Sequence, residues 1–166
     1  LNAGVDTLQV SGASTTTASD GVSFTNVAAG TVLKITASNV DTTMTYVAAA
    51  TSGASDSATV TYEGAVATAA GDAALSYGAT SGIETLNIVS QGAANTVGSV
   101  VFGGTTVNIT GDANLNIRSS LDTTTATIDA NGFTGNLTVI AGNTGAATAV
   151  AGVDVAASVL PVPAPA

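Results

Sequence analysis

The stretch Gly82-Ile83-Glu84-Thr85-Leu86-Asn87-Ile88 repeats an earlier one, Gly4-Val5-Asp6-Thr7-Leu8-Gln9-Val10, at a distance of 78 positions. Val22-Ser23-Phe24 returns at the same offset as Val100-Val101-Phe102. A short insertion around residues 103–107 then moves the offset to 82, at which Leu33-Lys34-Ile35 matches Leu115-Asn116-Ile117. A repeat of this kind indicates a structural building block that is used twice, with about 80 residues in each copy.

Short apolar–polar–apolar triplets run through both copies. Alternation with a period of two is the pattern of a β-strand with one buried face, and the many Thr residues favour the same conformation. Gly, Asn, Asp and Ser separate the triplets, as expected of turns. The predicted strands contain the pairs Leu8/Val10, Val22/Phe24, Leu33/Ile35, Met44/Tyr46, Val60/Tyr62, Leu75/Tyr77, Leu86/Ile88, Val100/Phe102, Val107/Ile109, Leu115/Ile117, Ala126/Ile128 and Leu137/Val139.

The composition also favours strands. Hydrophobic residues make up 45% of the 166 residues, but the bulky ones are few: three Phe, three Tyr, one Met and no Trp. A core built from them consists of thin layers of Val, Ile and Leu, each of which contributes about 1.5–3 kcal/mol when buried. Strands stack closely enough for such a core, so we expect an all-β protein.

Two all-β architectures fit this pattern. The first is a β-solenoid-like stack of short strands (a parallel β-helix) built from the two repeats of about 80 residues. The second is a pair of tandem Ig-like β-sandwiches. The second copy favours the solenoid, because the triplets that begin at Val107, Leu115, Ile128 and Leu137 are separated only by tight turns.

The repeat divides the chain into three parts. Residues 1–80 form the first β-repeat module, residues 81–145 the second, and residues 146–166 an Ala/Pro-rich extended tail or linker, which could also serve as an arm for strand addition. The one helix-like stretch, residues 65–75, is rich in Ala but also contains Gly and β-branched residues, and we expect a loop there. We interpret the whole as a piece of a longer precursor.

Charge excludes several function classes. Eleven acidic residues face only two basic ones, Lys34 and Arg118, which gives a net charge of −9. Binding to nucleic acid or to an anionic membrane surface needs clusters of basic residues. No apolar run is long enough to insert into a membrane. Without His or Cys, and with aromatic residues at only 4%, the chain offers few groups for catalysis, and we expect that it is not an enzyme.

Three segments carry a family resemblance: Thr127-Ile128-Asp129-Ala130-Asn131-Gly132-Phe133-Thr134-Gly135-Asn136-Leu137-Thr138-Val139, residues 82–88 and residues 108–117. They resemble the repeat units of bacterial S-layer proteins and of calcium-dependent (RTX-type) secreted surface adhesins. The resemblance implies repeated β-modules that form a lattice or a stalk, commonly ordered by calcium. The nonapeptide calcium motif of the adhesins, Gly-Gly-x-Gly-x-Asp, does not occur in this chain.

A calcium site can be sought among the oxygen-bearing residues of the second copy. Calcium takes six to eight oxygen ligands, from carboxylates, amide side chains and carbonyls. Alternating residues of a strand share one face, and further acidic residues follow nearby. These side chains could equally well form turns and solvate an exposed face. The candidate ligands are Asp112, Asn114, Asn116, Asp122, Asp129 and Asn131.

From these observations we expect a structural, non-catalytic component of a bacterial cell-surface layer or secreted adhesin, located outside the cell. It would self-assemble as a homo-oligomer through β-edges and, in addition, through calcium. One alternative is a subunit of an extracellular filament assembled by strand exchange. Another is a carbohydrate- or receptor-binding module that contacts a cell-surface glycan, for which Phe133 is the candidate aromatic residue.

Overall fold

The protein is all-β. The computed structural model describes residues 4–14, 21–79, 81–140 and 148–150. In that part of the chain the only helical element is a single 3-10 turn, η1 (Ala48–Ala50). No helix of these residues is long and apolar enough to cross a membrane.

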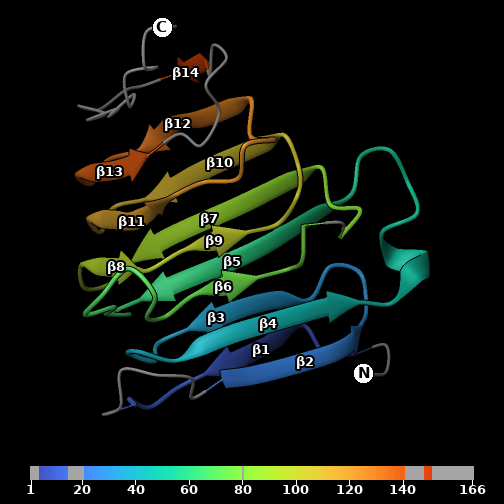
Figure 1. The fold of residues 1–166 in the computed structure, drawn as a ribbon, viewed down its shortest axis with the longest axis horizontal. Helices are drawn as coiled ribbons and strands as arrows, with labels where there is room; N and C mark the ends of the chain where they lie inside the picture. Colours follow the sequence, from blue (N-terminus) through green and yellow to red (C-terminus); the bar gives the residue numbers. More distant parts are fainter. Residues whose placement is uncertain (1–3, 15–20, 80, 141–147, 151–166) are drawn as a thin grey trace, which may run out of the picture.

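The largest sheet of the described residues has seven strands, all parallel, stacked in the order in which they occur along the chain (Figure 1). Each pairs with the next along the stack in a register without shifts, except for one irregularity between the fifth and sixth strands. These strands are β1 (Thr7–Val10), β3 (Val32–Ile35), β5 (Ser57–Glu63), β7 (Thr85–Gln91), β10 (Thr106–Gly111), β12 (Thr127–Phe133) and β14 (Thr148–Val150).

Two smaller parallel sheets face the large one. One has four strands and the other has three. Isolated parallel bridges outside the strands join Ala13 to Ser38 and Val66 to Thr96. The four-stranded sheet contains β2 (Gly21–Val27), β4 (Asp41–Tyr46), β6 (Leu75–Ser76) and β9 (Val100–Val101). The three-stranded sheet contains β8 (Asn95–Val97), β11 (Leu115–Ser120) and β13 (Leu137–Ile140).

The chain returns to the seven-stranded sheet at nearly regular intervals, and we call the residues from one strand of this sheet to the next a circuit. The first three circuits are the longest and differ slightly in length: Leu8 lies beside Leu33, Leu33 beside Val60, and Val60 beside Ile88. The next three are shorter and equal: Thr85 lies beside Thr106, Thr106 beside Thr127, and Thr127 beside Thr148. A parallel neighbour requires a long connection, and here the smaller sheets supply it.

The core lies between the sheets and is filled by the inward half of each strand. In β5 and β7 every second residue is buried, as the alternation predicts. Small and medium side chains dominate, and larger ones, among them Met44, Tyr62 and Phe102, are almost completely buried. One continuous apolar cluster runs through all the circuits from Val10 to Val139.

The predicted strands are confirmed, with ends that differ by a residue in places, and so is the loop predicted for residues 65–75. The alternative prediction, tandem Ig-like sandwiches, is wrong. The sheets of those domains are antiparallel, whereas every strand pair of the described residues is parallel. Two strands, β8 and β14, were not predicted. The remaining residues of the predicted tail, apart from β14, lie outside the described residues.

The sequence repeat corresponds to more than one circuit. The offset of 78 connects β1 with β7, which are three circuits apart. The offset of 82 matched Leu33 with Leu115, but these residues lie in different sheets, so that part of the alignment does not reflect structural equivalence. The proposed boundary at residue 80 is crossed by the continuous pairing of β5 with β7.

Candidate functional site

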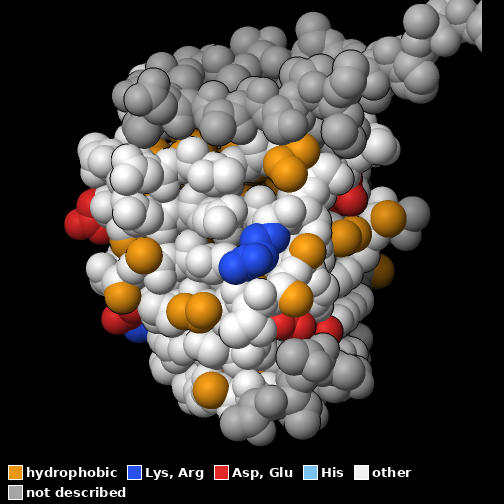
Figure 2. All heavy atoms as spheres, turned by 60° about the vertical axis from the view of Figure 1, so that its left-hand side comes forward, with side chains coloured by type: hydrophobic (Ala, Val, Ile, Leu, Met, Phe, Trp, Pro, Cys, Tyr) orange, Lys and Arg blue, Asp and Glu red, His pale blue; other side chains and the backbone are white. Residues whose placement is uncertain are grey.

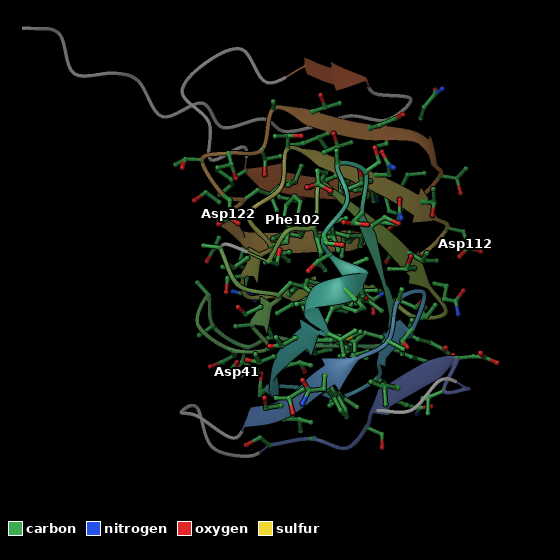
Figure 3. The ribbon with its side chains drawn as sticks, turned by 90° about the vertical axis from the view of Figure 1, so that its right-hand side faces the viewer. Asp41, Phe102, Asp112 and Asp122 are labelled. Atoms are coloured by element: carbon green, nitrogen blue, oxygen red, sulfur yellow. The ribbon has the colours of Figure 1, made fainter. Side chains whose placement is uncertain are left out.

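The six predicted calcium ligands lie at several places in the second half of the chain. Asp112 and Asn114 lie in the turn between β10 and β11, whereas Asp122 follows β11. Figure 3 shows Asp112 and Asp122 at opposite edges of the molecule. Asn116 lies in β11, and Asp129 and Asn131 lie in β12. Within the described residues, no group of three or more acidic side chains is close enough together to hold an ion.

Three of these side chains already accept hydrogen bonds from the backbone. Asp122 Oδ2 accepts from the Phe102 and Gly103 amides, at 2.9 and 3.0 Å. Asn114 Oδ1 accepts from the Asn136 amide at 2.9 Å, which links neighbouring circuits. Asp129 Oδ1 accepts from the Asn131 amide, also at 2.9 Å. These oxygens satisfy backbone donors where the regular pairing of a sheet is interrupted.

Other acidic residues serve the same purpose. Asp41 Oδ1 accepts from the Ala74 amide at 2.9 Å, and Glu84 Oε2 accepts from the Asp56 amide at 2.7 Å, in both cases across circuits. Asp72 Oδ2 accepts from the Thr68 hydroxyl and from the Ala69 amide within one turn. The acidic side chains therefore stabilise corners, where backbone N–H groups lack partners in a sheet.

An ion pair lies on the outer face of the seven-stranded sheet. Lys34 Nζ is 2.6 Å from Glu63 Oε2, and Gln91 also donates to this carboxylate. The hydrogen bond from Lys34 lowers the pKa of Glu63 below its ordinary value, with a smaller contribution from Gln91. Figure 2 shows one face of the molecule, on which charged and apolar side chains occur in small, separate groups.

Among the described residues, no strand covers the outer side of the first circuit. Leu8, Val22 and Phe24 pack against the core but are only partly buried. Their neighbours in the second circuit are covered on both sides: Leu33 and Met44 are completely buried, and Thr42 nearly so. The difference arises because each later circuit covers the one before it, and no described strand covers the first.

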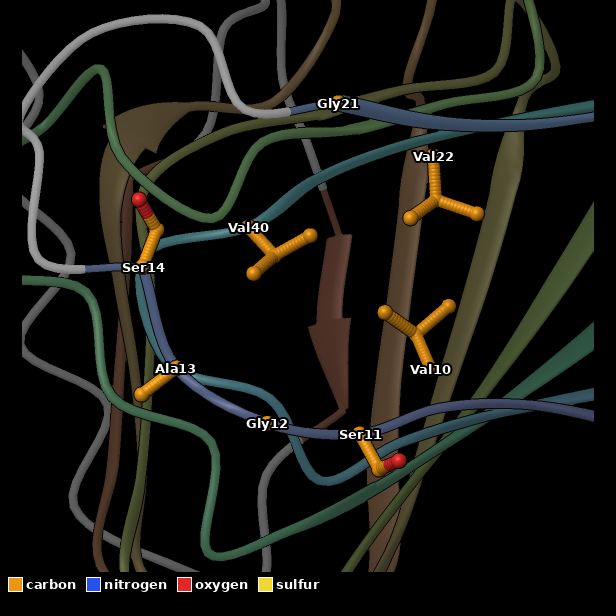
Figure 4. A pocket seen from close by; sticks show the side chains of 8 residues that line it. All are labelled: Val10, Ser11, Gly12, Ala13, Ser14, Gly21, Val22 and Val40. Carbon is orange, nitrogen blue, oxygen red and sulfur yellow. The ribbon is translucent and has the colours of Figure 1, made fainter.

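A hollow of about 510 Å³ lies at this end. Val10, Val22 and Val40 converge on it from three segments, and residues 11–14 curve around its rim (Figure 4). The exposed side of an apolar core is a favourable surface for association, because covering it removes apolar area from water. We call this hollow, together with β1 and β2, the open end.

The two strands of the open end are also sheet edges. Among the described residues, β1 has only β3 as a neighbour and β2 has only β4. The carbonyl groups of Asp6 and Val10 accept from the Val32 and Thr36 amides of the second circuit. Backbone groups of the alternate residues, Thr7 and Gln9, therefore point away from β3. Neither strand contains Lys, Arg or Pro, the residues that commonly protect an edge from pairing.

The aromatic residue predicted for sugar binding is not available. Phe133 is 2% exposed and packs in the apolar core, at the end of β12. The alternation of β12 is interrupted at Asn131 and Gly132, which are both exposed, and the register with β10 shifts there, so that the Phe133 ring points into the core. The prediction that Phe133 is an exposed binding residue is wrong.

The open end was not identified from the sequence, although its signal is present there. Thr7–Val10 and Gly21–Val27 are the first two strands and carry no charged residue. Comparisons with protein-family models, with curated proteins and with solved structures gave no match.

Proposed function

We propose that this chain is a β-solenoid module that self-assembles through its open end, as a structural component of a bacterial surface layer or secreted adhesin. The solenoid is supported by the succession of parallel circuits in register. Self-assembly is supported by one observation above all: no described strand pairs with the outer edges of β1 and β2, and the apolar residues Leu8, Val22 and Phe24 beside them are only partly buried.

Pairing of β1 with a strand of a second molecule makes two favourable contributions to the free energy of association. The outward N–H and C=O groups of Thr7 and Gln9 gain hydrogen-bond partners, and the partly exposed Leu8, Val22 and Phe24 lose contact with water. Strand addition of this kind is a common mode of assembly.

Charge favours this end over the rest of the surface. The chain carries a net charge of −9, so most faces of two copies repel one another. Asp6 precedes β1 and Asp20 precedes β2 in the sequence, whereas β1 and β2 themselves are uncharged. Contact at the open end therefore encounters less repulsion than contact at the acidic corners.

The first experiment measures the oligomeric state as a function of concentration. Analytical ultracentrifugation and electron microscopy of the wild-type protein should show oligomers, sheets or fibres. Gln9→Lys places a charge on the edge strand and should shift the equilibrium to monomers. Its matched control is Gln91→Lys, because Gln91 is also exposed but lies on β7, which is paired on both sides.

Two outcomes contradict the proposal in different ways. A wild-type protein that stays monomeric at all accessible concentrations argues against self-assembly. Assembly that Gln9→Lys and Gln91→Lys affect equally argues against the open end as the interface. Repeating the measurement with calcium and with a chelator tests the cation contribution, for which Asp112→Ala and Asp129→Ala are the variants to compare.

A further inference from the structure

The outer edge of β1 is symmetric about its centre in the hydrogen-bonding groups that it offers. Among the described residues β1 pairs only with β3, and the Asp6 and Val10 carbonyls accept from that side. The outward N–H and C=O groups therefore belong to Thr7 and Gln9, one residue on either side of Leu8. The Leu8 side chain itself packs against the core.

An edge of this kind is complementary to a second copy of itself that runs in the opposite direction. In an antiparallel hydrogen-bonded pair, the N–H group of each residue donates to the C=O group of the other. With Leu8 opposite Leu8, Thr7 of each copy faces Gln9 of the other, and every outward group of both β1 strands gains a partner. A register centred on Gln9 would leave Thr7 without a partner inside β1.

The charge beside β1 favours the same register. Asp6 directly precedes the strand, which is itself uncharged. With Leu8 at the centre, Asp6 faces Val10 of the second copy, and the two Asp6 residues lie about 13 Å apart along the strands. This separation exceeds the Debye length of about 8–10 Å at physiological salt, so their repulsion is largely screened. A register centred on Thr7 would halve the separation.

Apolar side chains at the open end are covered by the same contact. Directly opposed residues that do not exchange hydrogen bonds have Cα atoms about 4.5 Å apart, so the two Leu8 side chains would touch. A twofold axis perpendicular to the sheet keeps the core of both copies on one side of it. The partly buried Val22 and Phe24 then lie at the junction of the two cores. Antiparallel pairing is also slightly more stable per residue than the parallel pairing of a head-to-tail stack.

We propose that two copies join head to head through antiparallel β1 strands, about a twofold axis at Leu8. This inference rests on the proposed assembly through the open end and adds the partner strand and its direction. The seven-stranded sheet of each copy continues into that of the other, in the symmetry that is commonest among oligomers. Both open ends are used in the pair, so a larger sheet or fibre grows from it through contacts elsewhere.

Single cysteines test this orientation, since the chain contains no Cys of its own. Leu8→Cys should give a disulfide-linked dimer on mild oxidation, because directly opposed Cβ atoms lie about 4.5–5.5 Å apart, close to the span of a disulfide. Thr7→Cys and Gln9→Cys, when mixed, should link to each other more than either links to itself. The matched control is Thr61→Cys, in line with Gln9 but on β5, which is paired on both sides; it should stay monomeric on a non-reducing gel.

Sedimentation of the same samples distinguishes this inference from the proposed assembly. A protein that assembles while its β1 cysteines link no more than Thr61→Cys overturns the head-to-head orientation and leaves assembly itself standing. A protein that stays monomeric overturns both. If Leu8→Cys fails to fold, the mixture of Thr7→Cys and Gln9→Cys decides, because preferential linkage between the two supports antiparallel pairing and its absence contradicts it.

Discussion

Replacement of Asn95 by Ala should destabilise the protein more than any exposed substitution, because this side chain connects neighbouring circuits. Asn95 is 2% exposed. Its Oδ1 accepts from the Ala65 amide at 2.9 Å, and its Nδ2 donates to Ser90 Oγ at 2.8 Å and to the Tyr62 carbonyl at 3.2 Å. Ser90 Oγ in turn donates to the Ala113 carbonyl, so the network spans three circuits.

The magnitude follows from the bonds that Asn95→Ala removes. The buried Ala65 N–H would lose its partner, at a cost of about 1–3 kcal/mol. Nδ2 also lies 3.4 Å from the Gln91 carbonyl, and the hydrogen bonds of its two N–H groups contribute about 0.5–1.5 kcal/mol each. The total loss is about 2–6 kcal/mol, a large part of the typical stability of a domain, about 5–15 kcal/mol.

Urea unfolding followed by circular dichroism measures this loss as a change in the free energy of unfolding. Asn114→Ala is the matched control, since Asn114 is exposed and its side chain accepts a backbone hydrogen bond at the surface, so its loss should be about 1 kcal/mol or less. If the two variants are destabilised equally, the network around Asn95 does not stabilise the stack as we argue.

Three further predictions follow from local geometry. Gly135→Ala should destabilise the protein by about 1–3 kcal/mol in thermal or urea unfolding, because the new Cβ would lie 2.8 Å from the Ala113 carbonyl, whereas Gly71→Ala has no atom within 4 Å and should be neutral. Burial raises the pKa of Tyr46 to about 12 and raises those of Tyr62 and Tyr77 as well. The phenolate absorbance of the folded protein should therefore increase only at pH values well above 10.0, the ordinary pKa of tyrosine. Since the folded-state pKa is raised, this contribution to stability is complete below pH 10 and is lost as the pH rises towards 12; titration near pH 10 in the native state would contradict it. The pKa of Glu63 is lowered, so its contribution is present above the ordinary Glu pKa and lost as the pH falls through the lowered value; Glu63→Gln should therefore show a smaller fall in melting temperature on acidification than the wild type.

Strand positions could be predicted from the sequence because burial alternates with a period of two along most of the strands, as in β5 and β7. The length of the circuit could not, because the first three circuits differ in length from one another and from the later ones. Unequal loops conceal a short repeat, and only an offset of 78 was visible, which is close to three circuits: the pairing places Leu8 in line with Ile88, two residues beyond Leu86. The regular part did leave a signal, since three similar triplets recur there at one constant spacing: Thr85-Leu86-Asn87, Thr106-Val107-Asn108 and Thr127-Ile128-Asp129.

The acidic residues show why the chemistry was harder to predict than the strands. A turn that binds calcium and a turn that satisfies its own amides both need oxygen atoms at similar positions. Asp122 and Asp129 fit either role in the sequence, and only the backbone around them shows which donors lie within reach. The tyrosine pair was likewise hidden, because Tyr46 and Tyr77 are far apart in the sequence and meet only through the register of β4 and β6.

The architecture explains where function can be placed in such a chain. Positions inside the stack are fixed by neighbours on both sides, as with Leu33 and Met44, and a change there disturbs at least two circuits. The corners and the first circuit lack this constraint: short and long loops fit at the same corner, and the open end has a described neighbour on one side only. Recognition of other molecules can therefore vary at these places without altering the core, and the open end is one of them.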